Sequence, residues 1–168
     1  MNRIKWRIRR EILTAVDFNP ASLIELELNG IVTELLVTDE DLEDILCSAL
    51  NNGMAYWCKG VCPKDGHWEG YFAEEHIVKG GTLILEDLDG KQYELNKFKM
   101  LRGIAYLIAL SNLDLSRYGF ENKDAYYVNA ENTLLVLKAS HCLYTGNIDA
   151  YIADLIVQYG IFGKQVFA

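Results

Sequence analysis

The sequence predicts an α+β fold in which an antiparallel sheet, built from hairpins, packs against three to four helices. Two hairpin signals and the order of the elements lead to this prediction. Asn29-Gly30 and Asp89-Gly90 each separate two apolar runs, and such pairs favour tight hairpin turns, in which positive φ is required. Strand and helix patterns do not alternate regularly, which disfavours a doubly wound parallel sheet. With 168 residues, 51% of them hydrophobic, the chain is expected to form a single domain over residues 1–168.

The expected strands show alternating apolar residues or short runs rich in aromatic and β-branched residues. In residues 22–28, for example, Ile24, Leu26 and Leu28 share one face. The expected strands are residues 3–8, 22–28, 31–37, 54–59, 82–87, 91–95, 126–128 and 133–138. Residues 60–70 are rich in turn-forming residues and are expected to form a loop.

The first expected helix begins after Thr38, whose hydroxyl can cap it, and acidic residues in its first turn suit the helix dipole. We expect Gly53 to end this helix in a left-handed conformation. Its buried stripe is expected to contain Leu42, Ile45, Leu46 and Ala49.

Three further helices are expected. The first covers residues 71–78 and ends at Gly80-Gly81. The second begins at Asn96 and reaches about residue 110, and the last is capped by Asp149 and ends at Gly160 or Gly163. The residues spaced for burial are Phe98, Leu101, Ala105 and Ile108 in the former helix and Ile152, Leu155, Ile156 and Tyr159 in the latter.

Charge is distributed unevenly along the chain. The formal net charge is −8, but five basic residues and no acid lie in the first ten positions, so the remainder carries −13. A body with this charge disfavours direct binding of nucleic acid, since affinity for polyanions comes mainly from Lys and Arg. The basic strand at residues 1–10 can contact nucleic acid or an acidic patch on a partner, or it can discourage aggregation at a sheet edge, and we favour the last interpretation. Its basic residues are Arg3, Lys5, Arg7, Arg9 and Arg10.

The first helix carries a cluster of carboxylates that has two interpretations. Such a cluster can imitate the charge of a nucleic-acid backbone and bind a basic groove on a partner protein. Alternatively, it is a solvated helix face whose acids favour the N-terminus. The candidate partner-binding residues are Asp39, Glu40, Asp41, Glu43 and Asp44.

Two cysteines and a histidine in the segment 58–70 suggest a metal site. Cys58, Cys62 and His67 follow the spacing C-x3-C-x4-H on a glycine-rich stretch, and structural zinc takes four such ligands. Cys47 is the candidate fourth ligand, with His76, His141 and Cys142 as further possibilities. The alternative, which we favour, is that Cys58 packs in the core and the other two are ordinary loop residues.

Catalytic motifs are weak. Cys142 and His141 are adjacent, as a nucleophile and base would need to be in space, but adjacent side chains generally point apart. The sequence contains no phosphate-binding loop, dinucleotide fingerprint or nucleophile elbow. We therefore expect a protein without enzymatic activity. Tyr and Trp are enriched in protein-binding surfaces, but most of the aromatic residues near the loop are expected to be core or half-buried. These residues are Tyr56, Trp57, Trp68, Tyr71, Phe72, Tyr126 and Tyr127.

The lengths of the apolar runs indicate the cellular compartment. The longest apolar run is far shorter than the ~20 residues that cross a bilayer, and the basic start is not followed by the apolar stretch of a secretion signal. We expect a cytoplasmic protein without a membrane partner and with reduced cysteines.

Three segments resemble a family of small proteins from phages and prophages of Gram-positive bacteria. They are residues 37–58, which end in Tyr56-Trp57-Cys58 after the capped helix, residues 71–81 and residues 149–163. The similarity covers about residues 37–98 and the last 20 residues. The sequence departs from the family pattern in the loop, at residues 62–67, and across residues 111–145. No enzymatic role is assigned to this family. Some anti-CRISPR proteins of streptococcal prophages are similar in size, charge and possible zinc content.

This resemblance, together with the acidic helix, predicts a phage counter-defence protein. We expect it to bind a host nucleic-acid-binding defence protein, such as a type II CRISPR RNA-guided nuclease, and to block its access to target DNA. The alternative is a zinc-binding phage accessory protein with a binding role outside immunity, and a cysteine hydrolase using Cys142 and His141 is a third possibility that we do not favour.

Overall fold

The computed structural model describes residues 5–13, 20–28, 31–112, 125–128, 134–137 and 142–168. It confirms the α+β class. Helices α1 (Asp39–Ser48), α2 (Ala73–Val78), α3 (Lys97–Asn112) and α4 (Ala150–Phe162) accompany two sheets. A π-helical turn over Ala49–Gly53 extends α1, and a 3-10 turn over Thr145–Asn147 precedes α4.

The larger sheet has the strand order β1-β2-β3-β9-β8-β7. Its pairs are antiparallel except for β3 and β9, which run parallel. Its strands are β1 (Lys5–Leu13), β2 (Pro20–Leu28), β3 (Ile31–Thr38), β7 (Ala125–Val128), β8 (Leu134–Leu137) and β9 (Cys142–Tyr144). The basic strand β1 lies at one edge of this sheet, while residues 1–4 lie outside the described chain.

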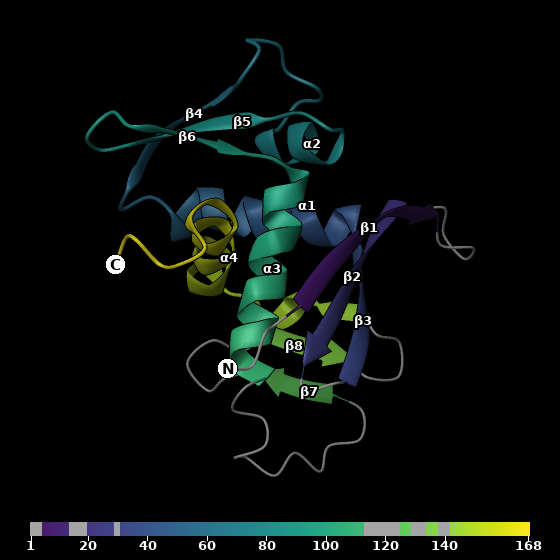
Figure 1. Ribbon diagram of the computed structural model, residues 1–168. Helices are drawn as coiled ribbons and strands as arrows, with labels where there is room; N and C mark the ends of the chain where they lie inside the picture. Colours follow the sequence, from purple (N-terminus) through teal and green to yellow (C-terminus); the bar gives the residue numbers. More distant parts are fainter. Residues whose placement is uncertain (1–4, 14–19, 29–30, 113–124, 129–133, 138–141) are drawn as a thin grey trace.

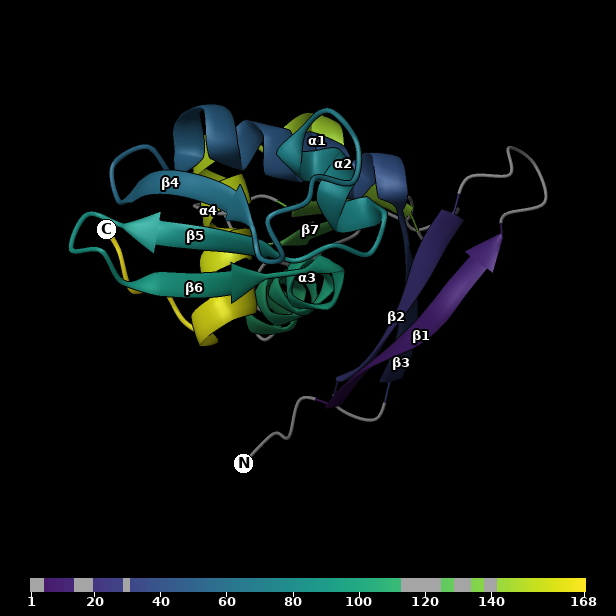
Figure 2. The ribbon, with the colours of Figure 1, turned by 90° about the horizontal axis from the view of Figure 1, so that it is seen from above.

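The smaller sheet has the order β4-β5-β6 and is antiparallel. Its strands are β4 (Cys58–Pro63), β5 (Leu83–Asp87) and β6 (Gln92–Leu95). Figure 1 shows this sheet at one end of α3 and the strands β7 and β8 towards the other end, with α4 beside α3. Figure 2 shows β4, β5 and β6 well separated from β1, β2 and β3.

Both predicted hairpins are confirmed. In the first, Ile24 pairs with Leu35 and Leu28 with Ile31, although Asn29-Gly30 lies outside the described residues. In the second, Gly90 has a φ of 85° in the turn between β5 and β6. The short strand β9 was not predicted. It pairs with β8, which precedes it in the chain, and with β3, which is distant in sequence.

The predicted helix caps are also confirmed. Thr38 and Asp41 form a capping box, in which the Thr38 hydroxyl accepts from the Asp41 N–H and the Asp41 carboxylate accepts from the Thr38 N–H. Asn96 Oδ1 accepts from Lys99 N, and Asp149 Oδ1 accepts from Ile152 N, each at 2.9 Å. Gly163, with φ 71°, ends α4.

The predicted boundaries around β4 are wrong. Residues 54–57 form a turn, in which Cys58 N donates to Met54 O at 2.9 Å, and the strand is Cys58–Pro63. The part of the expected loop from Gly60 to Pro63 is therefore in a strand, and a register shift between Cys58 and Gly60 accommodates the extra residue Lys59. Aromatic content favoured a strand at 54–57, but Trp57 is turned into the core by a contact distant in sequence.

Gly53 has a different role from the one predicted. Its φ is not positive, and the helix continues through it as a π-helical turn. A Cβ at this position would collide with the backbone carbonyl of Ala150 at the start of α4. Glycine is therefore required at position 53 for close approach of two helices, not for a left-handed stop.

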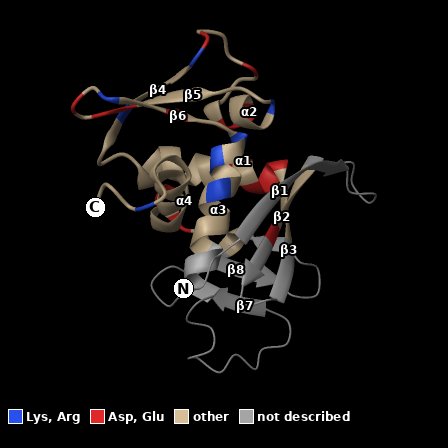
Figure 3. Cartoon of the chain, viewed as in Figure 1, with Lys and Arg blue, Asp and Glu red and all other residues tan. Residues whose placement is uncertain are grey.

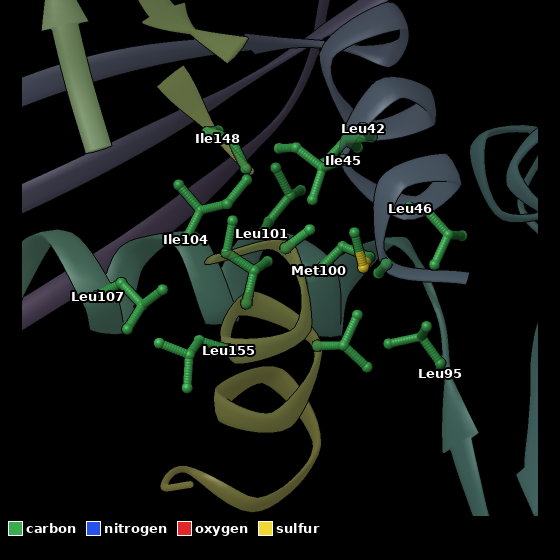
Figure 4. Close-up of a cluster of buried hydrophobic side chains, with 14 of the residues drawn as sticks. Leu42, Ile45, Leu46, Leu95, Met100, Leu101, Ile104, Leu107, Ile148 and Leu155 are labelled. Carbon is green, nitrogen blue, oxygen red and sulfur yellow. The ribbon is translucent and has the colours of Figure 1, made fainter. Parts of the chain in front are cut away.

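One hydrophobic core joins residues of both sheets and of the four helices (Figure 4). Leu42, Ile45 and Leu46 of α1 are buried there as their spacing predicts. Phe98 is 51% exposed, contrary to expectation, because periodicity predicts a helix face but not how far its neighbours cover the first turn. None of the helices, over the residues described, is long and apolar enough to cross a membrane.

The core depends on a close crossing of α3 and α4. A Cβ at Gly103 would collide with the Ile156 carbonyl, and one at Gly160 would collide with the Lys99 carbonyl. Arg102 of α3 donates from Nε to the Gly160 carbonyl oxygen at 2.8 Å. The two helices thus approach backbone to backbone, and the arginine satisfies a carbonyl near the end of α4.

The variant Gly103→Ala tests this crossing. Alanine favours a helix interior by about 1 kcal/mol, so a simple propensity effect would stabilise the protein. We expect the collision to outweigh that gain and to lower the free energy of unfolding by about 2 kcal/mol, measured by urea denaturation. The control is Gly60→Ala in β4, where the added Cβ comes no closer than 3.9 Å to another group; equal losses in the two variants would contradict the close crossing.

A buried carboxylate fixes the turn before β4. Asp154 of α4 is fully buried; its Oδ1 accepts from Trp57 Nε1 at 2.8 Å and its Oδ2 from the Tyr56 hydroxyl at 2.7 Å. Gln158, one turn later, donates to Oδ2 at 2.8 Å. Burial raises the pKa of Asp154, and these hydrogen bonds oppose the rise because they favour the charged form.

Gln158 extends the cluster to the C-terminal tail. Its Oε1 accepts from the backbone N–H groups of Val166 and Phe167, each at 2.8 Å. The Phe167 ring stacks on Trp57 with centroids 4.5 Å apart. Burial and the Asp154 hydrogen bond raise the pKa of Tyr56 to about 12, so its hydroxyl remains a donor at alkaline pH as well as at neutral pH.

Replacing Asp154 should show how much this cluster contributes. Asp154→Ala removes the acceptor of the indole, the phenol and the Gln158 amide, and an unsatisfied buried donor costs about 1–3 kcal/mol. We expect the free energy of unfolding to fall by about 3 kcal/mol or more, as judged by urea denaturation. Asp44→Ala, which removes an exposed acid, should change it by less than about 0.5 kcal/mol. A loss in Asp154→Ala no larger than that of the control would refute a stabilising role.

Candidate binding surface on α1, α2 and the segment 68–72

The five acidic residues of α1 do not share one role. Asp39 pairs with Lys97 at the start of α3, with Oδ1 and Nζ 2.6 Å apart, and Asp41 closes the capping box. Burial raises the pKa of Asp41, against the lowering effect of its bonds to Thr38. Glu40 and Asp44 are exposed, and Glu43 is half-buried. The structure therefore leaves three of the five predicted partner-binding residues for an external contact.

Helix α2 adds two carboxylates to this surface. Burial raises the pKa of Glu43, and the charges of Glu75, Asp39, Glu74 and Asp44 raise it further. Glu43 thus lies in a field of carboxylates from two helices. We call Glu40, Glu43, Asp44, Glu74 and Glu75 the acidic surface, and Figure 3 shows acidic residues gathered at the start of α1. Glu74 and Glu75 were missed in the sequence, where only their adjacency next to the loop marked them.

Beside the acidic surface lies a row of exposed aromatic side chains. Tyr71 is 95% exposed, Phe72 61% and Trp68 43%. The expectation that most aromatic residues near the loop are core or half-buried is therefore wrong: of those that the structure describes, Trp57 is buried, whereas Tyr56, Trp68, Tyr71 and Phe72 are exposed. The reason at Tyr71 and Phe72 is local: α2 begins only at Ala73, so both residues precede the helix and its buried face. We call residues 68–72 the aromatic segment.

The backbone of the aromatic segment is attached to α2. Glu69 N donates to His76 Nδ1 at 2.9 Å, and Tyr71 N donates to Glu75 Oε2 at 2.8 Å. The Trp68 ring meets the His76 ring edge-on with centroids 5.5 Å apart. The two acceptors, Glu75 and His76, are neighbouring residues of the same short helix. The aromatic side chains are therefore held in place without being covered.

His76 is a structural residue. It is buried, and its Nε2 lies 3.2 Å from the Thr82 carbonyl oxygen while its Nδ1 accepts from Glu69. Acceptance at Nδ1 requires a neutral ring with the proton on Nε2, where it can be donated to Thr82. Both nitrogens are thus occupied by the backbone, which leaves no lone pair for a metal ion.

The predicted zinc ligands are spread over different elements. Cys58 and Cys62 lie at opposite ends of β4, roughly 13 Å apart along a strand, whereas two sulfurs on one zinc ion lie within about 4 Å of each other. His67 follows in the exposed loop, and Cys47 of α1 accepts a hydrogen bond from Asn51. In the part of the chain that the structure describes, no three His, Cys, Asp or Glu side chains are grouped to hold a metal.

The environment of the Cys58 thiol also disfavours zinc binding. Burial raises the pKa of Cys58, which favours the thiol over the thiolate that binds zinc. Its Sγ donates to the Gly60 carbonyl oxygen at 3.4 Å. Cys62 is exposed and free. His141 and the side chain of Cys142 lie outside the described residues, so the predicted zinc site and the hydrolase pair both stay predictions.

A search for related proteins found no match to any family model, curated protein or solved structure. The resemblance to phage and prophage proteins therefore stays a prediction.

The crowding of carboxylates around Glu43 predicts a pH-dependent stability. Since its pKa is raised in the folded state, folding is penalised where Glu43 is ionised in both states, and the penalty disappears as the pH falls through the raised pKa towards the ordinary value. Glu43→Gln should therefore raise the urea midpoint at pH 7, and the gain should vanish in acid. Glu40→Gln, on the exposed side of α1, is the control. A gain for Glu43→Gln that is constant from pH 7 to pH 4 would contradict the effect of charge.

Proposed function

We propose that the protein is an inhibitor without catalytic activity that binds a basic, nucleic-acid-binding host protein through the acidic surface. The observation that carries the proposal is that α2 packs against α1, so that the charges of Glu74 and Glu75 act on Glu43 together with those of α1. A field of this sign on a surface steers association with a positively charged groove and competes with the phosphates that such a groove holds. The acidic surface has five carboxylates, whereas α1 alone leaves three for an external contact, because Asp39 pairs with Lys97 and Asp41 caps the helix.

The partner that we put first is a type II CRISPR RNA-guided nuclease. Such an enzyme holds nucleic acid in a positively charged channel through contacts to the backbone, which is the kind of surface that an acidic protein can occupy. The resemblance to phage and prophage proteins supports this choice, because phages gain from blocking target DNA access in the host cytoplasm. The partner class is therefore argued from charge, and the nuclease from the resemblance.

The proposal is tested with a purified streptococcal type II nuclease, with and without guide RNA, by measuring its affinity for the protein between 50 and 500 mM salt. We expect binding that weakens steeply with salt, because exposed charges are screened. Glu40→Lys/Asp44→Lys should weaken binding at least about tenfold at low salt, mostly through slower association, and should restore target DNA cleavage in the presence of the protein.

The control reverses two exposed acids elsewhere, Asp65→Lys/Asp89→Lys, and so changes the net charge by the same amount. Equal losses in the two double variants would mean that only the overall charge matters, and salt-independent binding would exclude the electrostatic mechanism. If no nuclease binds and elemental analysis finds one zinc per chain that Cys58→Ser removes, the zinc-binding accessory function replaces this proposal.

A further inference from the structure

The aromatic segment exposes more apolar surface than its place in the fold requires. Trp68, Tyr71 and Phe72 fall within five residues, and each shows two-fifths or more of its surface to solvent. Clusters of exposed aromatic side chains mark binding sites in soluble proteins, and Tyr and Trp are enriched among the residues that dominate binding energy. The segment is therefore a candidate contact in its own right, separate from the charge beside it.

The aromatic segment is also preorganised. Glu69 and Tyr71 each give their backbone N–H to a side chain of α2, and the Trp68 ring packs edge-on against buried His76. Gly70, with φ 96°, makes the turn between them. A ligand that contacts these rings thus loses little affinity to ordering of the loop.

The net charge around the aromatic segment indicates which kind of group binds there. Residues 68–79 contain the acids Glu69, Glu74 and Glu75 and one base, Lys79, for a net charge of three negative and one positive, or −2. A second copy of the chain is disfavoured, since a two-fold contact would set these acids against their own copies. A cationic group that also stacks on aromatic rings satisfies both features.

Among protein side chains, arginine meets this requirement better than lysine. The guanidinium group is planar and weakly hydrated, stacks on aromatic faces, and pairs with a carboxylate through two parallel hydrogen bonds. The lysine ammonium is a compact and strongly hydrated charge. Rings at 71 and 72 beside carboxylates at 74 and 75 offer both kinds of contact within one turn of α2 and the residues before it.

We propose that the aromatic segment recognises arginine side chains of the partner, by stacking on Tyr71 and Phe72 and pairing with the adjacent carboxylates. This inference rests on the proposed function, because the partner is the basic protein proposed there. It adds that the aromatic segment distinguishes arginine from other positively charged side chains in the partner's groove.

The probe is a capped nonapeptide with three arginines separated by glycine and serine, compared with the same peptide carrying lysines. Binding to the full chain is measured by calorimetry and by amide shifts of residues 68–75. We expect the arginine peptide to bind about tenfold more tightly, which corresponds to stacking on two rings. In Tyr71→Ser/Phe72→Ser this preference should disappear, while Tyr151→Ser, at a tyrosine that is 49% exposed on α4, should keep it.

A second variant separates stacking from charge. Glu74→Gln/Glu75→Gln keeps an oxygen that can accept from Tyr71 N, so it should weaken both peptides while a preference for arginine persists. Equal affinity for the two peptides, a preference that survives Tyr71→Ser/Phe72→Ser, or no binding of either peptide at 1 mM would overturn the inference. Circular dichroism and thermal unfolding of each variant exclude loss of the fold as the cause.

The nuclease experiment distinguishes this inference from the proposed function. If Glu40→Lys/Asp44→Lys abolishes nuclease binding and Tyr71→Ser/Phe72→Ser leaves it unchanged, the acidic surface is the contact and the arginine inference is wrong. If the arginine peptide is preferred as expected but no nuclease binds, the proposed function fails and the recognition of arginine stands.

Discussion

The buried carboxylate of Asp154 is the interaction on which the arrangement of this protein most depends. It accepts hydrogen bonds from Tyr56, Trp57 and Gln158, which offset part of the cost of its lost hydration. Trp57 immediately precedes β4, so the direction in which the three-stranded sheet leaves the core is set by this contact. Through Gln158 the same cluster fixes the C-terminal tail. A buried carboxyl group thus links the turn before β4, which is distant in sequence, to α4 and the C-terminal tail.

The candidate binding surface follows from that arrangement. Helix α2 packs against α1 and against β4 and β5. Its residues Glu75 and His76 hold the backbone of the aromatic segment, and the charges of Glu74 and Glu75 act on Glu43. The two parts act at different ranges. Charge attracts a partner over a Debye length, about 8–10 Å at moderate salt, whereas the rings act only in contact and determine how long a complex lasts. A short helix therefore carries both a steering field and a specific contact.

Much of the fold was predictable because its signals are local. An Asp-Gly turn, the capping residues Thr38, Asn96 and Asp149, and a glycine after α4 each act within four residues of themselves. The acidic cluster on α1 was visible in the same way. The predictions that failed involve distant partners: Trp57 leaves the expected strand for Asp154, and Gly53 is needed where α4 begins. The exposure of Tyr71 also depended on where α2 starts, a boundary that no residue in the loop marks.

By itself, then, the sequence determined the fold class, both hairpins, the starts of α1, α3 and α4, and the sign of the charge on α1, since each follows from turn geometry, capping or composition. The tertiary structure decided which carboxylates are available to a partner, because Asp39 pairs with Lys97 and Asp41 caps α1. It also brought Glu74 and Glu75 near Glu43. It also separated Cys58 from Cys62 along β4. The physical reason is the same throughout: burial and long-range pairing depend on which surfaces meet, and spacing along a chain does not specify that.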